Sequence, residues 1–259
     1  LVGSEMCIRD RYPHLKVIDN IAFPLKQKGM KKAERYEKAR KIAEMLQIEY
    51  LLDRKPTQLS GGQQQRVSMA RALVKEPDVL LLDEPMSNLD ARLKIEIRDE
   101  IRRVQQETGI TSIIVTHDQE EAMAIADKIA ILDNGRIQQY DTPEHLYHYP
   151  ANLFVAKFMG NPPMNFIDAA LSADGTRVEG AGFSLPLEQH MAQGGKKFAG
   201  HAVKVGVRSH LMAVHTEKVP QSMEMRLQIA ENLGKEILIS GMVGDSFVRV
   251  TCLLYTSDA

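Results

Sequence analysis

The feature that most constrains the fold is a short, uninterrupted apolar run that ends in two carboxylates. The run Val79–Leu82 is followed at once by Asp83 and Glu84. Such a run, without polar alternation, is typical of a strand that is buried on both faces of a sheet. The carboxyl ends of such strands are where α/β proteins place ligand-binding groups. The run therefore predicts an α/β core with a site beside Asp83 and Glu84.

Helical and strand patterns alternate around this run. Lys31–Ile48 and Leu93–Glu107 carry apolar residues at helical spacing, with charged residues elsewhere. Ser112–Thr116 is a second apolar run, and Lys128–Leu132 is a third strand candidate that ends at an Asn-Gly turn. This alternation predicts a parallel sheet with helices on both faces.

The pattern changes after about Gly160, where a Pro-Pro pair at 162–163 indicates a boundary. Short alternating segments follow, separated by Gly and Pro, without helices between them. This pattern predicts a small all-β barrel or sandwich. The expected strands are Asn165–Leu171, Arg177–Glu179, His201–Arg208, Met223–Leu233, Glu236–Met242 and Phe247–Val250.

Composition excludes several classes of protein. The chain has 259 residues, 44% of them hydrophobic, which suffices for a sizeable core. Lys+Arg (33) and Asp+Glu (34) nearly cancel to a net charge of −1, so no basic field attracts nucleic acid or an anionic membrane. No apolar run approaches the roughly 20 residues of a membrane span. Two cysteines, Cys7 and Cys252, form no disulfide framework, which fits a reducing compartment.

Three local motifs carry candidate chemistry. The sequence Leu-Ser-Gly-Gly-Gln, with Ser60, Gly61 and Gly62 at a predicted helix start, offers backbone N–H groups to an anion. The alternative is a plain Gly-Gly turn that Ser60 caps. Asp83 and Glu84 suit Mg²⁺ binding and activation of a water, and the alternative is a solvated acidic turn.

The third motif is His117, at the end of the next strand, where a histidine can contact a γ-phosphate. The alternative is a structural histidine. His145 and His148 stand at helical i,i+3 spacing, which also suits a metal. Because no further ligand lies nearby in the sequence, a solvated helix face is favoured for this pair.

Taken in order, these motifs resemble the ATP-binding cassette (ABC) family. The Leu59–Gln63 pentapeptide (LSGGQ) resembles the family signature, and Val79–Glu84 resembles Walker B with its catalytic glutamate. Ser87–Asp90 resembles the D-loop, and His117 resembles the switch histidine. Tyr12–Leu15 resembles the segment after the Q-loop, where the family docks a permease's coupling helix; a plain Tyr-Pro turn is the alternative.

The second half resembles importer ATPases of the maltose and glycerol-phosphate uptake type. Phe154–Phe166 is similar to their linker, whereas Val205–Arg208 and Glu231–Gly234 resemble their C-terminal regulatory domain. The resemblance implies an α/β fold: a P-loop NTPase-like cassette whose N-terminal part is missing, followed by an incomplete OB-like β-barrel regulatory domain. An unrelated β-domain is the alternative for the last part.

The chain also departs from the family. It has no GxxxxGK[ST] phosphate loop, no Q-loop glutamine and no adenine-stacking aromatic residue. Residues 1–11 and 252–259 match nothing in the family, so both are expected to be non-native segments, and they contain both cysteines. We therefore expect a partial nucleotide-binding domain over residues 12–160 and an incomplete regulatory domain over 161–251. The chain alone is expected to be inactive without the phosphate loop.

The resemblance implies an ATP-hydrolysing importer subunit that uses ATP and Mg²⁺ to energise uptake of a sugar or glycerol phosphate. Its implied partners are a second nucleotide-binding subunit, transmembrane permease subunits and, indirectly, a solute-binding protein. No nucleic-acid partner is implied. The implied location is the cytoplasmic face of the cell membrane. The resemblance also implies a role for each candidate residue. Ser60, Gly61 and Gly62 would bind the γ-phosphate in trans, and Gln63 would support the helix start. Asp83 would bind Mg²⁺ through water, Glu84 would act as general base, His117 would contact the γ-phosphate, and Asp90 would couple the two sites across the dimer.

Three alternatives remain open at the level of sequence. In the first, the importer takes up a solute other than a sugar or glycerol phosphate, such as a polyamine, iron or sulfate. The protein is a soluble cassette ATPase that acts on DNA or ribosomes, although the coiled-coil insertions and basic arms of that class are missing from this chain. The chain is a regulatory protein with an inactive ATPase half, which the presence of Glu84 and His117 argues against.

Overall fold

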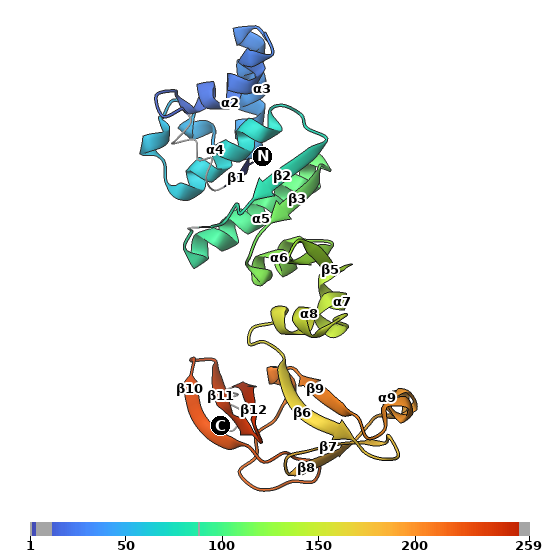
Figure 1. The fold of residues 1–259 in the computed structure, drawn as a ribbon. Coiled ribbons are helices and arrows are strands. Elements are labelled where there is room, and N and C mark those ends of the chain that lie inside the picture. Colours follow the sequence, from blue (N-terminus) through green and yellow to red (C-terminus); the bar gives the residue numbers. More distant parts are fainter. Residues whose placement is uncertain (1, 4–11, 88, 254–259) are drawn as a thin grey trace. The chain divides into compact units, whose positions relative to one another are not determined.

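The computed structural model describes residues 2–3, 12–87 and 89–253, which belong to two compact units, 1–127 and 128–259 (Figure 1). The elements of the first unit are β1 (Val2–Gly3), α2 (Val17–Gln27), α3 (Lys32–Met45), η2 (Glu49–Leu51), η3 (Pro56–Gln58), α4 (Gly61–Leu73), β2 (Val79–Asp83), α5 (Ala91–Thr108), β3 (Thr111–Val115) and α6 (Gln119–Ile125). Those of the second are β4 (Ile129–Asp133), β5 (Arg136–Asp141), α7 (Pro143–His148), α8 (Leu153–Phe158), β6 (Asn165–Leu171), β7 (Arg177–Gly180), β8 (Phe183–Pro186), α9 (Gln189–Gly195), η4 (Lys196–Phe198), β9 (Ala202–Val207), η5 (Ser209–Leu211), β10 (Arg226–Asn232), β11 (Glu236–Val243) and β12 (Ser246–Leu253).

The core of the first unit forms where the predicted apolar stripes meet. The inward residues of α3 include Ala39, Ala43 and nearby Leu46, which are fully buried. On α5, Ile97 and Ile101 are buried in the same cluster. These spacings of three and four residues place the side chains on one helix face, so both predicted helices are confirmed within two or three residues at their ends.

Strands β2 and β3 pair in parallel, as the alternating pattern predicts, and β1 lies on the other side of β2. Leu80 and Leu82 face the core, but Val79 and Leu81 are 45% and 38% exposed. The expectation of burial on both faces is therefore wrong for the described residues. Leu81 pairs with Ile113 of β3, which is also exposed (53%), so no described element covers this apolar face.

The third predicted strand exists as β4, but it does not extend the parallel sheet. It pairs antiparallel with β5, which the sequence analysis did not predict. Asn134 and Gly135 adopt φ values of 48° and 74°, the left-handed conformation that a tight hairpin turn requires. This turn reverses the chain at once, so the strand's neighbour is the next segment of sequence.

The rest of the second unit is a β-domain with two sheets, in the orders β8-β7-β6-β9 and β10-β11-β12. Every neighbouring pair of strands is antiparallel. The six predicted strands are present, whereas β8 and α9 were not predicted. Ile167 and Val178 from the first sheet and Val243 and Val248 from the second share one buried cluster. The sheets therefore enclose a common core, in agreement with the predicted barrel-like domain.

The predicted domain boundaries stay predictions. The predicted boundary near Gly160 lies inside the second compact unit, which begins at Lys128. At the C-terminal end, β12 continues to Leu253 and pairs Cys252 with Ile237, so the sheet extends past the predicted limit at residue 251. Residues 4–11 and 254–259, on which most of the non-native interpretation falls, lie outside the described residues. Among the described helices, none combines the length and apolarity of a membrane span.

Arg208 joins the β-domain to the short helices that precede it. The residue is 4% exposed, and its guanidinium donates to the carbonyl oxygens of Tyr147 (2.7 Å), Ala156 (3.1 Å) and Met159. It also lies over the Tyr147 ring, 4.0 Å from the centroid. The fork of N–H donors thus satisfies carbonyls near the ends of α7 and α8.

We predict that Arg208→Ala lowers the free energy of unfolding of the second unit by about 3 kcal/mol, because it leaves buried carbonyls without donors. Urea unfolding followed by circular dichroism measures this loss. Arg177→Ala is the matched control, since the guanidinium of the more exposed Arg177 bonds to the Oγ and the carbonyl oxygen of Ser184, at 2.8 and 2.7 Å. Equal losses for the two variants would contradict the assigned role of Arg208.

Candidate functional site

The carboxyl ends of β2 and β3 bring Glu84 and His117 together. The parallel ladder pairs Asp83 with Val115, and the Glu84 N–H then donates to the Val115 carbonyl at 2.8 Å. Each strand therefore releases its next residues at the same edge of the sheet. Nδ1 of His117 lies 3.0 Å from Oε1 of Glu84, within hydrogen-bond distance.

This pair is open to solvent, with side-chain exposures of 75% for His117 and 38% for Glu84. The hydrogen bond to Glu84, together with attraction by its charge, raises the pKa of His117 above the ordinary 6.5. Burial opposes this effect, and nearby Glu121 and Asp118 raise that pKa further. The pair therefore favours an imidazolium beside a carboxylate, with both side chains accessible to a ligand.

The backbone at Glu84 sets the direction of its carboxylate. Its φ of 43° lies in the left-handed region, which costs a non-glycine residue of order 1 kcal/mol. Ser87 holds this conformation, since its N–H and Oγ both bond to the Glu84 carbonyl, at 3.2 and 3.0 Å. Asp83, the last residue of β2, is exposed at the same strand end. Two carboxylates in different backbone environments thus follow one another at the sheet edge.

A second cluster lies at the start of α4. Ser60 is the N-cap, and its Oγ accepts the Gln63 N–H at 3.4 Å. Oε1 of Gln63 accepts the Ser60 N–H at 3.0 Å, which completes a capping box. The N–H groups of Gly61 and Gly62 belong to the first turn, where a helix provides no carbonyl partner. They are available to an anion, and the helix dipole adds positive potential.

Helix α5 starts against this glycine pair. A Cβ on Gly62 would lie 2.6 Å from Cδ1 of Leu93, and one on Gly61 would lie 3.4 Å from Cδ2 of Leu89. Asp90 caps α5 by accepting the Leu93 N–H at 3.0 Å. In the sequence, Asp90 therefore lies between Leu89 and Leu93, the two leucines that face Gly61 and Gly62.

Among the described residues, hydrogen bonds do not join the capped glycines to the carboxylate–histidine pair. Ser60 and Gln63 bond within the α4 start, whereas Glu84 and His117 bond at the sheet edge. The predicted residues thus form two clusters, with Asp90 on the helix that begins beside the first.

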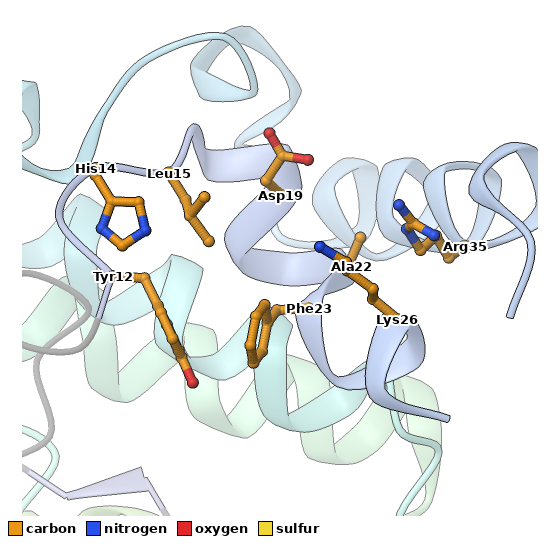
Figure 2. A pocket seen from close by; sticks show the side chains of 8 residues that line it. All are labelled: Tyr12, His14, Leu15, Asp19, Ala22, Phe23, Lys26 and Arg35. Carbon is orange, nitrogen blue, oxygen red and sulfur yellow. The ribbon is translucent and has the colours of Figure 1, made fainter. Parts of the chain in front are cut away.

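A third feature is a hollow of about 340 Å³ beside the start of α2 (Figure 2). The rings of Tyr12 and Phe23 are 4.4 Å apart, and Arg71 lies over the Tyr12 ring. The buried Asn20 fixes the loop by donating to the carbonyls of Tyr12 and Leu15, at 3.3 and 3.1 Å. Besides Tyr12 and Phe23, the lining residues are His14, Leu15, Asp19, Ala22, Lys26 and Arg35.

The sequence predicts a role for Tyr12–Leu15 but gives no prediction for the α2 side of this hollow. Asp19, Ala22, Phe23 and Lys26 recur at spacings of three and four, so they share one helix face. That periodicity was the available signal. The His145–His148 pair forms no metal site with a third described ligand; His145 instead pairs with Asp141, Nδ1 to Oδ2, at 2.7 Å.

Comparison with known families agrees with this architecture. The ABC transporter family matches residues 6–87, and the MalK OB fold domain family matches residues 160–209. The solved structure of cbiO1 from Clostridium perfringens, part of the ABC transporter complex cbiONQ, has a TM-score of 0.51 and 30% identity. The match covers 54% of this chain and 56% of the cbiO1 chain. The predicted fold class, a cassette followed by an OB-like domain, is therefore confirmed.

Curated relatives agree as well. The sn-glycerol-3-phosphate import ATP-binding protein UgpC of Vibrio vulnificus is 42% identical over 93% of this chain, and the maltose/maltodextrin import ATP-binding protein MalK of Yersinia pestis is 47% identical over 88%. The trehalose/maltose import ATP-binding protein MalK of Thermococcus litoralis is 44% identical over 90%. Residues 6–87 therefore match the ABC transporter family, and the chain is similar to ATP-binding subunits of sugar and glycerol-phosphate importers. It spans 62–64% of the length of these relatives.

We predict that His117→Ala destabilises the chain more at about pH 5.5 than at about pH 9. The raised pKa means that the stabilisation is fully present below the unfolded-state value and is lost as pH rises through the folded-state value. Urea unfolding at both pH values measures the two losses. In a Glu84→Gln background the difference between them should shrink, because only the weaker attraction by Glu121 and Asp118 then remains. Equal losses at both pH values in the wild-type background would contradict the pairing.

Gly62→Ala is predicted to lower the free energy of unfolding by about 1–2 kcal/mol, since Leu93 must move away from the new methyl group. Gly61→Ala is the matched control, because its methyl group meets Leu89 only at ordinary contact distance. Denaturant unfolding of the two variants measures the difference. A loss at Gly61 as large as that at Gly62 would show that the Leu93 contact is not the cause of the loss at Gly62.

Proposed function

We propose that this chain is part of the ATP-hydrolysing subunit of an ABC importer, which energises uptake of a sugar or glycerol phosphate through a membrane permease. The observation that carries the proposal is the Glu84–His117 contact at the edge of a parallel sheet. A carboxylate that can act as a base lies beside an imidazole that can contact a phosphate, and this arrangement supports the proposal. The similarity to import ATP-binding proteins supports the transport role and this class of solute.

Glu84 is the proposed general base. Its carboxylate accepts a proton from the water that attacks the γ-phosphate, and the backbone at residue 84 sets where that water sits. His117 is exposed and favours its charged form, so it suits contact with the γ-phosphate. Positioning and charge neutralisation supply most of the catalysis in phosphoryl transfer. The two side chains divide these tasks between them.

Asp83 is the proposed anchor for Mg²⁺. Its carboxylate ends β2, is exposed to solvent and is followed directly by a second carboxylate, and this hard-oxygen donor set fits the ion. Mg²⁺ usually keeps several waters and binds through one or two carboxylates plus substrate phosphates, so no larger ligand cluster is needed. When bound, the ion would neutralise charge on the β- and γ-phosphates.

Ser60, Gly61 and Gly62 are proposed to bind the γ-phosphate of a nucleotide held by a second nucleotide-binding subunit. The outward N–H groups at the start of α4 and the close approach that glycine allows support this role. Gln63 holds the helix start through the capping box. Asp90, capping the helix that begins beside these glycines, is proposed to couple the two sites of the dimer.

The hollow between Tyr12 and α2 is proposed to receive a coupling helix of the permease. The rings of Tyr12 and Phe23 and the charged side chains of Asp19, Lys26 and Arg35 line this hollow, and this mixture suits an amphipathic helix end (Figure 2). The subunit would then act at the cytoplasmic face of the membrane, with the solute-binding protein reached only through the permease.

We predict that Glu84→Gln abolishes turnover, with kcat falling about 10²–10⁴-fold, because the amide cannot accept the water's proton. The variant is placed in a longer protein that includes the family's phosphate loop. Phosphate release measures hydrolysis, and size-exclusion chromatography with ATP measures dimerisation, which should persist. Asp174→Asn, which alters a turn carboxylate of the β-domain, is the control and should hydrolyse ATP normally. Unchanged hydrolysis in Glu84→Gln would refute the assignment.

A further inference from the structure

Lys94 connects α5 to the start of α6 through two ion pairs. Its Nζ lies 2.8 Å from Oε1 of Glu121 and 3.0 Å from Oδ2 of Asp118. The Glu121 side chain is only 9% exposed, and those of Lys94 and Asp118 are 32% and 30% exposed. Hydrogen bonds to Glu121 and Asp118 raise the pKa of Lys94, so it stays charged. Two neighbouring carboxylates thus share one partly buried cation.

The same two carboxylates fix the loop that carries His117. The Thr116 hydroxyl donates to Oε2 of Glu121 at 2.8 Å and accepts the Asp118 N–H at 3.0 Å. Asp118 also caps α6 by accepting the N–H groups of Glu120 and Glu121, at 3.0 and 3.4 Å. The residues on both sides of His117 are therefore held by one hydrogen-bonded network, and Lys94 is its cation.

Lys94 lies one helical turn after Asp90. Its N–H donates to the Asp90 carbonyl at 2.9 Å, and the Asp90 side chain caps the same turn. The first turn of α5 therefore connects Asp90 to the network around His117 without a flexible segment. We propose that Lys94 is a positioning residue, which ties the Asp90 end of α5 to the His117 loop and so keeps His117 in reach of Glu84.

This inference rests on the proposed function for its catalytic meaning, but its geometry is testable without ATP. NMR titration of the histidine ring protons in the 259-residue chain reports whether His117 contacts Glu84, and His117→Ala assigns its signal. Lys94→Met removes both ion pairs. If Lys94 acts only by its charge, its loss leaves Glu121 and Asp118 unneutralised and raises the pKa of His117. If Lys94 positions the loop, the contact with Glu84 weakens and that pKa falls, by about 0.5 pH unit.

The two accounts therefore differ in sign. A fall in Lys94→Met, with the wild-type value kept in Lys94→Arg, supports positioning. A rise, or no change, overturns it. Lys16→Met is the matched control, because Lys16 forms a 2.9 Å pair with Asp53 in the same unit but away from this loop. Its His117 titration should equal that of the wild type.

Thr116→Val provides a second test, which keeps the inference falsifiable if Lys94→Met does not fold. It changes no charge and removes the hydroxyl that links Glu121 to the Asp118 N–H. A fall in the pKa of His117 supports the network, and an unchanged value overturns it. Because these measurements use no nucleotide, they fail or succeed independently of ATP hydrolysis, which the Glu84→Gln experiment tests.

Discussion

The parallel pairing of β2 with β3 is the constraint on which the candidate site depends. Parallel strands end at the same edge, so the residues that follow each strand meet there whatever their separation in sequence. The bond from the Glu84 N–H to the Val115 carbonyl extends the ladder by one residue and fixes the height of Glu84 relative to His117. A slip of one residue would send the Glu84 side chain to the other face of the sheet.

Helix α5 is the element that relates the two clusters. Its first turn contacts the glycine pair of α4 through Leu93 and holds the His117 loop through Lys94. A displacement at Asp90 would therefore also shift the start of α4 and the loop after β3. Packed elements transmit such displacements because close-packed contacts do not deform continuously. This arrangement gives the proposed coupling between subunits a physical route within one subunit.

Much of the fold followed from periodicity and turn chemistry. The stripes of α3 and α5, the two parallel strands and the Asn134–Gly135 turn were all predictable, because each is encoded in local sequence. Two features were not predictable. The exposed face of Val79 and Leu81 depends on what else packs on the sheet, which an apolar run does not specify. The ion pairs of Lys94 join residues far apart in sequence, and a lysine on a charged helix carries no signal of its partner.

The capped helix start shows why the two interpretations of the glycine motif were not exclusive. The Oγ of Ser60 is engaged by the Gln63 N–H, as the plain capped turn requires. That bond satisfies the donor at the third helical position and leaves those of Gly61 and Gly62 directed along the axis. The capping box therefore pre-orders the donors that a phosphate would meet, and less conformational entropy is lost on binding. At this position the structural role of Ser60 is the means by which a binding role becomes possible.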